Sequence, residues 1–442
     1  MIILRTLKDI SSRNIVASIL LFATAIFAAI VANSSWAPFY QQFLSQELHL
    51  CIGDFNLFSH GGHPLTVIEF INDGLMALFF LAVGLEIKRE LLVGELSSFR
   101  KAILPFIAAC GGMILPVIIY SFWVQTDMPE ARGMAIPMAT DIAFSLGVLS
   151  LLGNRVPLSL KIFLTAFAVV DDVGGILVIA LFYSSTVSYF YLIAVAVLYA
   201  VLYYMGRFGR VQKVVFWLFG VAIWYLFLQS GIHSTISGVI LAFAIPARPR
   251  LDAGKYIRRI RNVISTFPVS SPDNIVLTNE QIAALKQVEH ASDRVISPLQ
   301  SLEDHLRTSV NFIILPLFAF ANAGVVFSGN GELLGNVSMA VASGLLLGKF
   351  VGIYLFTWLA IKIGLAPMPN GMDWKNLAGV SMLGGVGFTV SLFIANLSFS
   401  ANYPDLLNQA KFGVLCGTVL SGIVGYILLR IFLSSRNASD TL

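Results

Sequence analysis

The sequence has 442 residues, of which 57% are hydrophobic and only 12% are charged, and its mean hydropathy is +0.82. A soluble domain carries about 25% charged residues, so a water-soluble core could not enclose this much apolar surface, and lipid is the expected solvent. The net charge of +4 is too small to indicate a nucleic-acid partner, and three scattered cysteines argue against a disulfide framework or a zinc site.

The chain begins with a basic segment followed by an apolar run over residues 15–32. This order is also found in secretory signal peptides. However, the run is longer than the apolar region of a signal peptide, and no small-residue cleavage site ends it cleanly. We therefore expect a retained first membrane span.

Further apolar runs of membrane-spanning length follow along the chain. A bilayer core of about 30 Å requires about 20 apolar residues per helix. On that criterion we predict an all-α integral membrane protein with a single transporter domain over 1–442. It has twelve spans, near 15–32, 68–86, 102–124, 131–151, 157–183, 188–206, 213–229, 231–246, 309–327, 338–362, 376–399 and 410–433.

The basic residues test this topology, because they favour the cytoplasmic side of a membrane. With a cytoplasmic N-terminus, sixteen of the 28 Lys and Arg residues fall in the predicted inner segments, and nine more in the long loop between spans eight and nine. The predicted outer segments hold only Arg132 and Lys411, and Lys349 lies within a span. The alternation predicts that both termini are cytoplasmic.

Two segments outside the membrane are distinctive. Residues 49–66 alternate apolar and polar positions around turn residues, which predicts a periplasmic β-hairpin. Residues 247–307 form a cytoplasmic insert that is basic at first. From Thr278 the insert has a Thr-x-x-Gln capping-box pattern and helical apolar spacing. We expect a surface or interfacial helix there; a solvated loop without a specific role is the alternative.

Four ionisable residues lie deep within predicted spans: Asp141, Asp171, Asp172 and Lys349. At a rise of 1.5 Å per residue, each is about 15–20 Å into its span, near the bilayer midplane. Each such charge costs about 2.5–3.5 kcal/mol on insertion scales, and such residues commonly mark ion paths. The alternative is a buried salt bridge that only fixes packing, for instance between Asp171 and Lys349, but this leaves two acids unpaired.

The adjacent aspartates point in directions about 100° apart on a helix, so they cannot share one partner symmetrically. One can face Lys349 while the other faces a water-filled cavity. Proximity and burial favour protonation of one member, so we expect a coupled pair that exchanges protons near physiological pH. A carboxylate in that condition binds either a proton or a hard cation, and Thr140 offers a further oxygen ligand.

The fourth and eleventh spans contain residues that interrupt helices. Pro137 precedes Thr140 in the fourth span, and three glycines between 384 and 387 precede Thr389 in the eleventh. Non-helical backbone at this depth is tolerated only beside protein or water. Interrupted spans in matching positions of two halves indicate the binding site of a transporter built from inverted repeats; ordinary small-residue packing is the alternative.

At these residues the sequence resembles the NhaA family of sodium/proton antiporters, whose inverted-repeat architecture is already known and enters here only as an implication. Seven stretches, distributed over the whole membrane region in the family's order, carry the resemblance. They are INDGLMALFFLAVGLEIKREL (71–91), MATDIAFSLG (138–147), AFAVVDDVGGI (166–176), GIHSTISGVI (231–240), LPLFAFANAGV (315–325), GLLLGKFVGI (344–353) and GGVGFTVSLFIA (384–395).

The resemblance implies twelve helices with inverted repeats and two broken helices, the fourth and eleventh, that cross. It implies electrogenic exchange of cytoplasmic sodium or lithium for periplasmic protons, without a cofactor or enzymatic activity, in a homodimer in the bacterial inner membrane. Asp171 and Asp172 would form the sodium and proton site, with Thr140 nearby. Asp141 would face the helix dipoles at the crossing, and Lys349 would pair with Asp171 or balance the dipoles.

The resemblance also implies a cytoplasmic pH-response cluster of Glu86, Arg89, Glu90 and Glu303, with His233 as a further candidate. A core histidine is the alternative for His233, and an interfacial anchor is the alternative for the segment from Glu86 to Glu90. The sequence departs from the family pattern in the insert over 247–307, which is longer and borders Glu303. The hairpin is expected to contribute to dimerisation.

Other classes fit the sequence less well. A channel would not require broken inverted repeats, and a symporter of a related inverted-repeat fold, the main alternative, would lack the paired aspartates. An intramembrane aspartyl protease usually carries a Gly-x-Gly-Asp element, which is absent. The segment Gly344–Lys349 does not match a phosphate-binding loop, because Phe350 stands where Ser or Thr is required.

Overall fold

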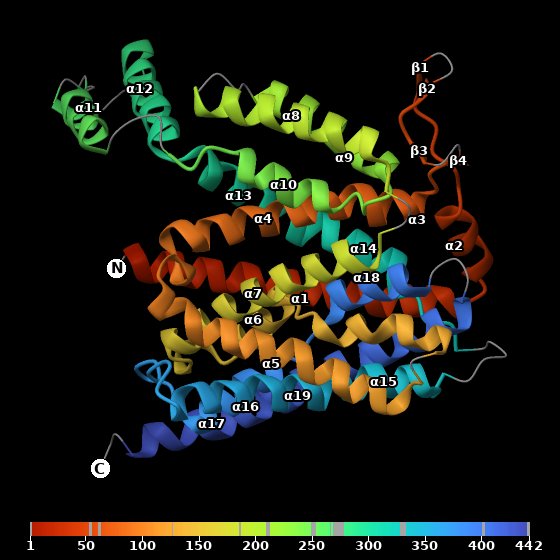
Figure 1. Cartoon of the computed structure of the whole chain (residues 1–442). Helices are drawn as coiled ribbons and strands as arrows, with labels where there is room; N and C mark the ends of the chain where they lie inside the picture. Colours follow the sequence, from red (N-terminus) through yellow and green to blue (C-terminus); the bar gives the residue numbers. More distant parts are fainter. Residues whose placement is uncertain are drawn as a thin grey trace.

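The computed structural model describes residues 2–52, 55–60, 63–125, 127–184, 187–208, 213–248, 253–265, 267, 278–327, 333–399 and 403–439. Most helices run roughly along one common axis, and both chain termini lie at the same end of the bundle (Figure 1). We call this the termini end. The opposite end carries the short strands, and we call it the hairpin end.

The first half of the chain is helical except for four short strands. Its elements are α1 (Ile2–Ala32), α2 (Ala37–Leu44), β1 (Cys51–Ile52), β2 (Phe55–Asn56), β3 (Ser59–His60), β4 (His63–Pro64), α3 (Val67–Phe70), η1 (Ile71–Leu75), α4 (Met76–Val93), η2 (Glu95–Ser97), α5 (Phe99–Trp123), η3 (Pro129–Met138), α6 (Ile142–Leu151), η4 (Gly153–Arg155), α7 (Leu158–Phe182) and α8 (Tyr189–Arg207).

The described part of the second half is helical throughout. Its elements are α9 (Lys213–Ser230), α10 (Ile236–Ala244), α11 (Ala253–Ser265), α12 (Asn279–Val295), α13 (Pro298–Ser309), η5 (Val310–Ile314), α14 (Leu315–Asn322), α15 (Asn336–Ser343), η6 (Gly344–Gly348), α16 (Lys349–Lys362), α17 (Trp374–Leu383), α18 (Phe388–Phe399) and α19 (Pro404–Ser439). The segments η1, η5 and η6 are single π-helical turns within longer helices.

Apolar length supports some of the predicted spans more than others. Within the described residues, seven helices are long and apolar enough to cross a membrane, or nine if each of two bent helix pairs counts as one span. The other three predicted spans, 213–229, 231–246 and 309–327, contain α9, α10 and η5 with α14. The apolar part of α9, Val214–Ser230, and the nine-residue α10 are too short, since about 20 residues are needed. Segments η5 and α14 continue directly from α13, whose charged residues lower the hydropathy of that longer helix.

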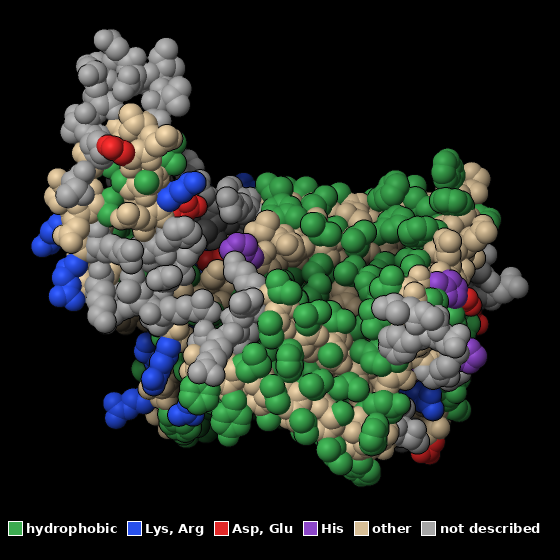
Figure 2. Space-filling view, turned by 90° about the horizontal axis from the view of Figure 1, so that it is seen from above, with side chains coloured by type: hydrophobic (Ala, Val, Ile, Leu, Met, Phe, Trp, Pro, Cys, Tyr) green, Lys and Arg blue, Asp and Glu red, His purple; other side chains and the backbone are tan. Residues whose placement is uncertain are grey.

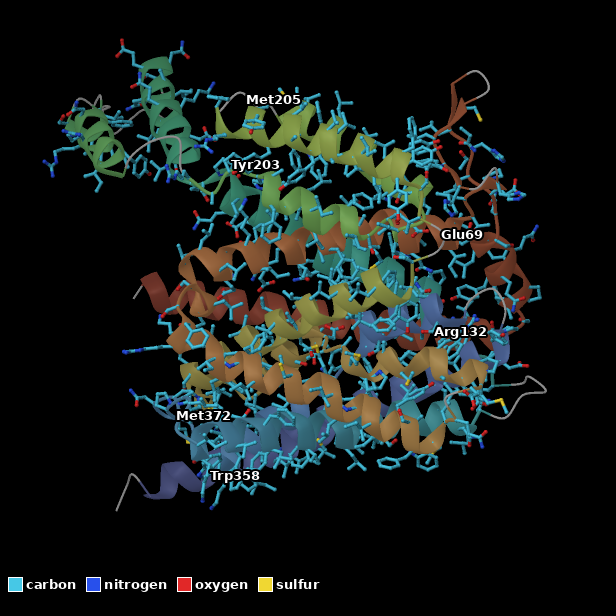
Figure 3. All side chains as sticks on the ribbon, in the orientation of Figure 1. Glu69, Arg132, Tyr203, Met205, Trp358 and Met372 are labelled. Carbon is cyan, nitrogen blue, oxygen red and sulfur yellow. The ribbon has the colours of Figure 1, made fainter. Side chains whose placement is uncertain are left out.

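The surface agrees with a membrane-embedded bundle. Apolar side chains cover the middle of the molecule, whereas most of the visible Lys and Arg side chains gather at the termini end (Figure 2). Glu69 and Arg132 lie at the hairpin end, and Trp358 and Met372 lie nearer the termini end (Figure 3). Charged groups therefore flank an apolar belt, as expected when lipid surrounds the middle of the helices.

The segment predicted as a hairpin forms two short antiparallel pairs instead of one continuous ladder. Strand β1 pairs with β2, and β3 pairs with β4. A bridge between Glu47 and Thr66 joins the two ends of the segment. Thr66 then starts α3 with a capping box, in which its hydroxyl accepts from Glu69 N and the Glu69 carboxylate accepts from Thr66 N.

The insert over 247–307 is largely helical where it is described. The predicted capping box is present, because the Thr278 hydroxyl accepts from Gln281 N and the side-chain oxygen Oε1 of Gln281 accepts from Thr278 N. The basic first part forms α11, and α12 lies between α11 and the bundle, across the direction of the spanning helices (Figure 1). Helix α13 follows after Ser297, whose hydroxyl accepts from Gln300 N.

Candidate ion-binding site

Two broken spans cross at the centre of the molecule. The pair η3 and α6 bends by 44° between Met138 and Ile142, and the pair α17 and α18 bends by 44° between Leu383 and Phe388. Pro137 lies in the last turn of η3, directly before the first break, and the glycine-rich segment 384–387 forms the second. The breaks predicted from Pro and Gly are thus present, because neither residue type supports a continuous helix well.

The extended segments at the two breaks hold each other through hydrogen bonds. Thr140 Oγ1 donates to Gly384 O at 2.8 Å, and Asp141 N donates to Val386 O at 2.6 Å. A Cβ atom added to Gly387 would stand 2.9 Å from Ala139 O. Glycine is therefore needed where the two backbones cross, and the backbone groups released by each break find partners in the other.

The Asp141 side chain lies at the N-termini of two helices. Its Oδ1 accepts from Phe144 N in the first turn of α6 at 2.9 Å. Its Oδ2 accepts from Thr389 N at 3.2 Å and from Thr389 Oγ1 at 2.6 Å, at the start of α18. Because helix N-termini carry partial positive charge, one carboxylate stabilises both helix starts at the crossing.

The two adjacent aspartates of α7 have different environments. Asp171 Oδ2 lies 2.6 Å from Lys349 Nζ, and both side chains are fully buried. The Lys349 ammonium also lies 5.5 Å from the centre of the Phe167 ring. The other oxygen of Asp171 is buried without a hydrogen bond among the described residues, although Thr140 lies beside this carboxylate.

Asp172 faces a cavity of about 110 Å³ instead of an ion-pair partner. No residue in the described part of the chain donates a hydrogen bond or supplies an ion-pair partner to its carboxylate. The cavity has room for several water molecules. Its lining residues are Phe79, Ala82, Val83, Glu86, Thr140, Asp141, Ile142, Ala143, Leu146, Asp172, Glu303, Arg307, Val310, Asn311, Leu315, Thr389 and Val390.

The cavity leads toward the termini end, where four of the five candidate pH-response residues meet. Arg89 Nη1 lies 3.0 Å from Glu303 Oε1, and its Nη2 lies 3.1 Å from Glu90 Oε1 and 3.7 Å from Glu86 Oε1. Burial raises the pKa of Glu303, although the two neighbouring arginines oppose this shift.

Arg307 is a member of this cluster that sequence reasoning missed. Its Nη2 lies 2.9 Å from Glu303 Oε1 and 3.8 Å from Glu86 Oε1. The sequence contained a signal for this contact, because Arg307 follows Glu303 by four residues on one helix. The Arg307 side chain is 43% exposed, so this side of the cavity reaches solvent.

His233 does not join the cluster. Its Nε2 lies 3.5 Å from Asp73 Oδ1, and its Nδ1 lies 2.9 Å from Thr235 Oγ1. Asp73 also accepts a hydrogen bond from Ser234 Oγ at 2.8 Å. These residues lie on η1 and at the start of α10, so the structure separates His233 from the charged groups around Glu303.

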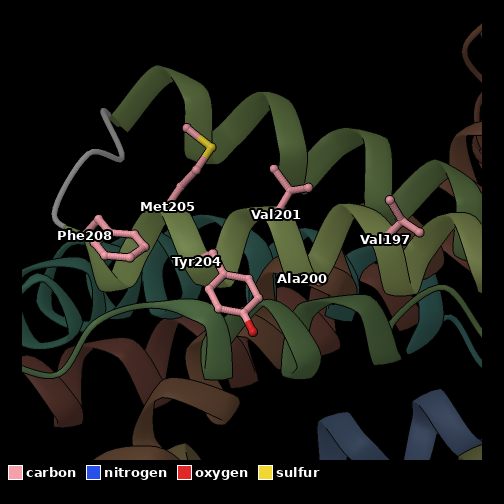
Figure 4. A pocket seen from close by; sticks show the side chains of 6 residues that line it. All are labelled: Val197, Ala200, Val201, Tyr204, Met205 and Phe208. Carbon is pink, nitrogen blue, oxygen red and sulfur yellow. The ribbon is translucent and has the colours of Figure 1, made fainter.

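A larger apolar pocket of about 450 Å³ lies elsewhere, along α8 (Figure 4). Its lining residues are Val197, Ala200, Val201, Tyr204, Met205 and Phe208, none of which is charged. Val201, Tyr204 and Phe208 are exposed by 43–70%. The pocket has the composition of a lipid-facing groove and carries none of the chemistry of the carboxylate site.

Crossed broken helices around buried carboxylates, with a cavity open to one end, define a membrane ion carrier of the secondary-transporter class. The comparisons with known proteins agree with this class. Residues 8–429 match the family Na+/H+ antiporter 1, and the chain belongs to this family.

Several bacterial relatives cover almost the whole chain. A Na(+)/H(+) antiporter NhaA of Bacteroides thetaiotaomicron is 73% identical over 99% of both chains. Proteins of the same name from Bacteroides fragilis and Parabacteroides distasonis are 70% and 49% identical, over 99% and 97% of this chain and 100% and 96% of their own. The resemblance recognised from the sequence is thus confirmed, and the alternative of a symporter is not supported.

Proposed function

We propose that this protein exchanges sodium for protons across a bacterial inner membrane. It is a transporter and not an enzyme. The observation that carries the proposal is the Asp172 carboxylate, which is open to a cavity of about 110 Å³ while its neighbour Asp171 is paired with Lys349. A carboxylate in this position can hold a proton or a sodium ion, and occupancy by one excludes the other.

The paired arrangement supports a division of roles. Lys349 stabilises the charged form of Asp171, so Asp172 is the group free to coordinate a cation, with Asp171 and Thr140 as further oxygen ligands. Sodium is a hard cation that prefers such oxygen ligands. Asp141 holds the crossing together and stabilises the two helix starts, which keeps the carboxylate site in place when the helices move.

The orientation of the protein in the membrane follows from the distribution of basic residues. We infer that the termini end is cytoplasmic, so the cavity gives cytoplasmic sodium access to Asp172. Twelve spans with inverted repeats, lithium as a second substrate, electrogenic exchange and a homodimer remain part of the proposal. So does a pH response through the cluster of Glu86, Arg89, Glu90 and Glu303. Release to the periplasm requires a second conformation, open at the hairpin end.

Proteoliposomes test the assignment of Asp172. With a fluorescent reporter of internal pH, Asp172→Asn should abolish proton movement driven by sodium, because a neutral amide cannot exchange a proton for a cation. Asp172→Glu should retain exchange with weaker apparent sodium affinity. Asp405→Asn, which neutralises an exposed carboxylate in the first turn of α19, is the matched control. Undiminished exchange by Asp172→Asn would refute the site.

A further inference from the structure

Three buried phenylalanines pack together on the hairpin side of the cavity beside Asp172. Phe393 lies 5.7 Å from Phe80 and 6.4 Å from Phe318 between ring centres. Their exposed fractions are 0%, 3% and 0%. They come from α18, α4 and α14, and each of these helices also lines the cavity with a residue nearer the termini end. An apolar constriction of this kind excludes water and ions.

A layer of three asparagines follows on the far side of the phenylalanines. Asn322 Nδ2 donates to Asn72 Oδ1 at 2.8 Å, and Asn396 Nδ2 donates to Asn322 Oδ1 at 2.8 Å. Asn72 Nδ2 reaches the same oxygen of Asn322 at 3.4 Å. Asn322 and Asn396 are buried, at 0% and 5% exposure. Side-chain amides thus join three helices that are far apart in sequence.

The order of residues along the helices shows that the two layers are stacked. On α18 it runs from Thr389 at the cavity through Phe393 to Asn396, and on α14 from Leu315 at the cavity through Phe318 to Asn322. Spacings of three and four residues place each step about one helical turn further on.

The next turn of α18 fixes the direction of this order. Ser398 Oγ donates to Tyr183 Oη at 3.0 Å, and that hydroxyl donates to the Arg132 carbonyl at 2.7 Å. Arg132 lies at the hairpin end (Figure 3). The path from the cavity to the hairpin end therefore meets the aromatic layer first and the amide layer second.

We propose that Asn72, Asn322 and Asn396 are the latch of the gate at the hairpin end. The proposal rests on the proposed antiport function, which requires a conformation open to that end. A latch must break in every transport cycle, so replacing its hydrogen bonds by hydrogen bonds to water must cost little free energy. Neutral amides meet this requirement, because the net contribution of such a hydrogen bond is small. Breaking a buried ion pair costs more, because it leaves uncompensated charges. The π-helical turn that carries Asn72 also gives this helix a place to rearrange.

Accessibility of a cysteine just inside the gate tests the latch. Val390 lines the cavity next to Thr389, so Val390→Cys in a background with Cys51, Cys110 and Cys416 replaced by serine reports entry from either end. Membrane vesicles are treated with a membrane-impermeant maleimide. A parallel sample retaining only the native Cys51, which is exposed on β1, identifies the vesicles that present the hairpin end outward.

Asn322→Ala removes the amide that contacts both other asparagines, and should increase the labelling rate from the hairpin end about tenfold. A tenfold shift corresponds to about 1.4 kcal/mol, which is the order of magnitude expected from losing the three hydrogen bonds that Asn322 makes within the layer. Labelling from the termini end should fall by the smaller fraction of molecules that leave the state open there. A change confined to packing would not produce opposite changes at the two ends.

Asn408→Ala is the matched control. Asn408 also makes two hydrogen bonds, with Val326 N at 3.0 Å and Val326 O at 2.8 Å, but outside the amide layer. The labelling rates of Val390→Cys from both ends should be the same with and without Asn408→Ala. An unchanged rate in Asn322→Ala, or an equal rise in Asn408→Ala, would overturn the proposal.

If Asn322→Ala does not fold, Asn396→Ala decides the question. It removes only the bond to Asn322 from the layer, so a smaller increase from the hairpin end supports the latch, and no increase overturns it. Sodium-driven proton flux is measured in vesicles of the parent protein. Absence of flux there would contradict the proposed function, whereas the labelling rates still decide the gate.

Discussion

Replacing Lys349 with alanine leaves the Asp171 carboxylate without its cationic partner inside the bundle. The Nζ–Oδ2 distance is 2.6 Å and both side chains are fully buried. Removing one partner of a buried pair costs about 3–5 kcal/mol, because the remaining charge is not compensated. In a chain of 442 residues, this loss corresponds to a fall in the thermal midpoint of about 3–10 °C.

The double variant Asp171→Asn/Lys349→Met separates the energy of the pair from the packing of its atoms. It removes both charges with little change in volume, so it should recover most of the stability lost in Lys349→Ala. The midpoints are measured by thermal unfolding of the purified proteins in detergent, with Lys375→Ala, an exposed lysine of α17, as the control. A double variant no more stable than Lys349→Ala would refute the reasoning, as would a Lys349→Ala protein as stable as the control.

Three further changes test other parts of the structure. Gly352→Val should lower the thermal midpoint, because the new Cβ would stand 2.2 Å from Gly111 O; an unchanged midpoint would contradict the close contact of α5 and α16. Thr389→Val removes the hydroxyl that donates to Asp141 at 2.6 Å, and should cost about 1.5–3 kcal/mol, as expected for a hydrogen bond to a charged group; a stability equal to that of the parent would argue against the shared cap. The raised pKa of Glu303 means that the folded protein binds this proton more tightly than the unfolded chain, so stability is lost as pH rises above about 4.5. The thermal midpoint of Glu303→Gln relative to the parent should therefore increase between pH 4 and pH 7, and a constant or falling difference would contradict this sign.

The chemistry of the site was largely readable from the sequence. Asp141, Asp171, Asp172 and Lys349 are charged residues within long apolar runs, where a charge is costly and therefore uncommon. They could be identified from the neighbouring sequence alone, without tertiary information. Pro137 and the glycines near 385 act on their own backbone, which is why both helix breaks could be predicted. The Thr278 capping box is a contact over three residues and was predicted for the same reason.

Segment lengths were less predictable. Helix α10 (Ile236–Ala244) covers only part of the predicted span 231–246, because the apolar run begins in a turn over residues 231–235 that hydropathy does not distinguish from a helix. The region 309–327 differs from its prediction at both ends: the helix stops at Asn322, and only the structure shows that α13 runs directly into η5 and α14, so that this helix begins at Pro298.

The sequence by itself determined that this chain lies in a membrane, that its spans carry acids at one depth, and that two spans are broken. Only the tertiary structure decided which groups meet: Lys349 with Asp171 across 178 residues, Thr389 with Asp141 across 248, and Asn72 with Asn322 across 250. It also placed His233 beside Asp73, away from Glu303. Hydropathy and backbone preference are properties of neighbouring residues, whereas these pairings depend on how separate helices pack.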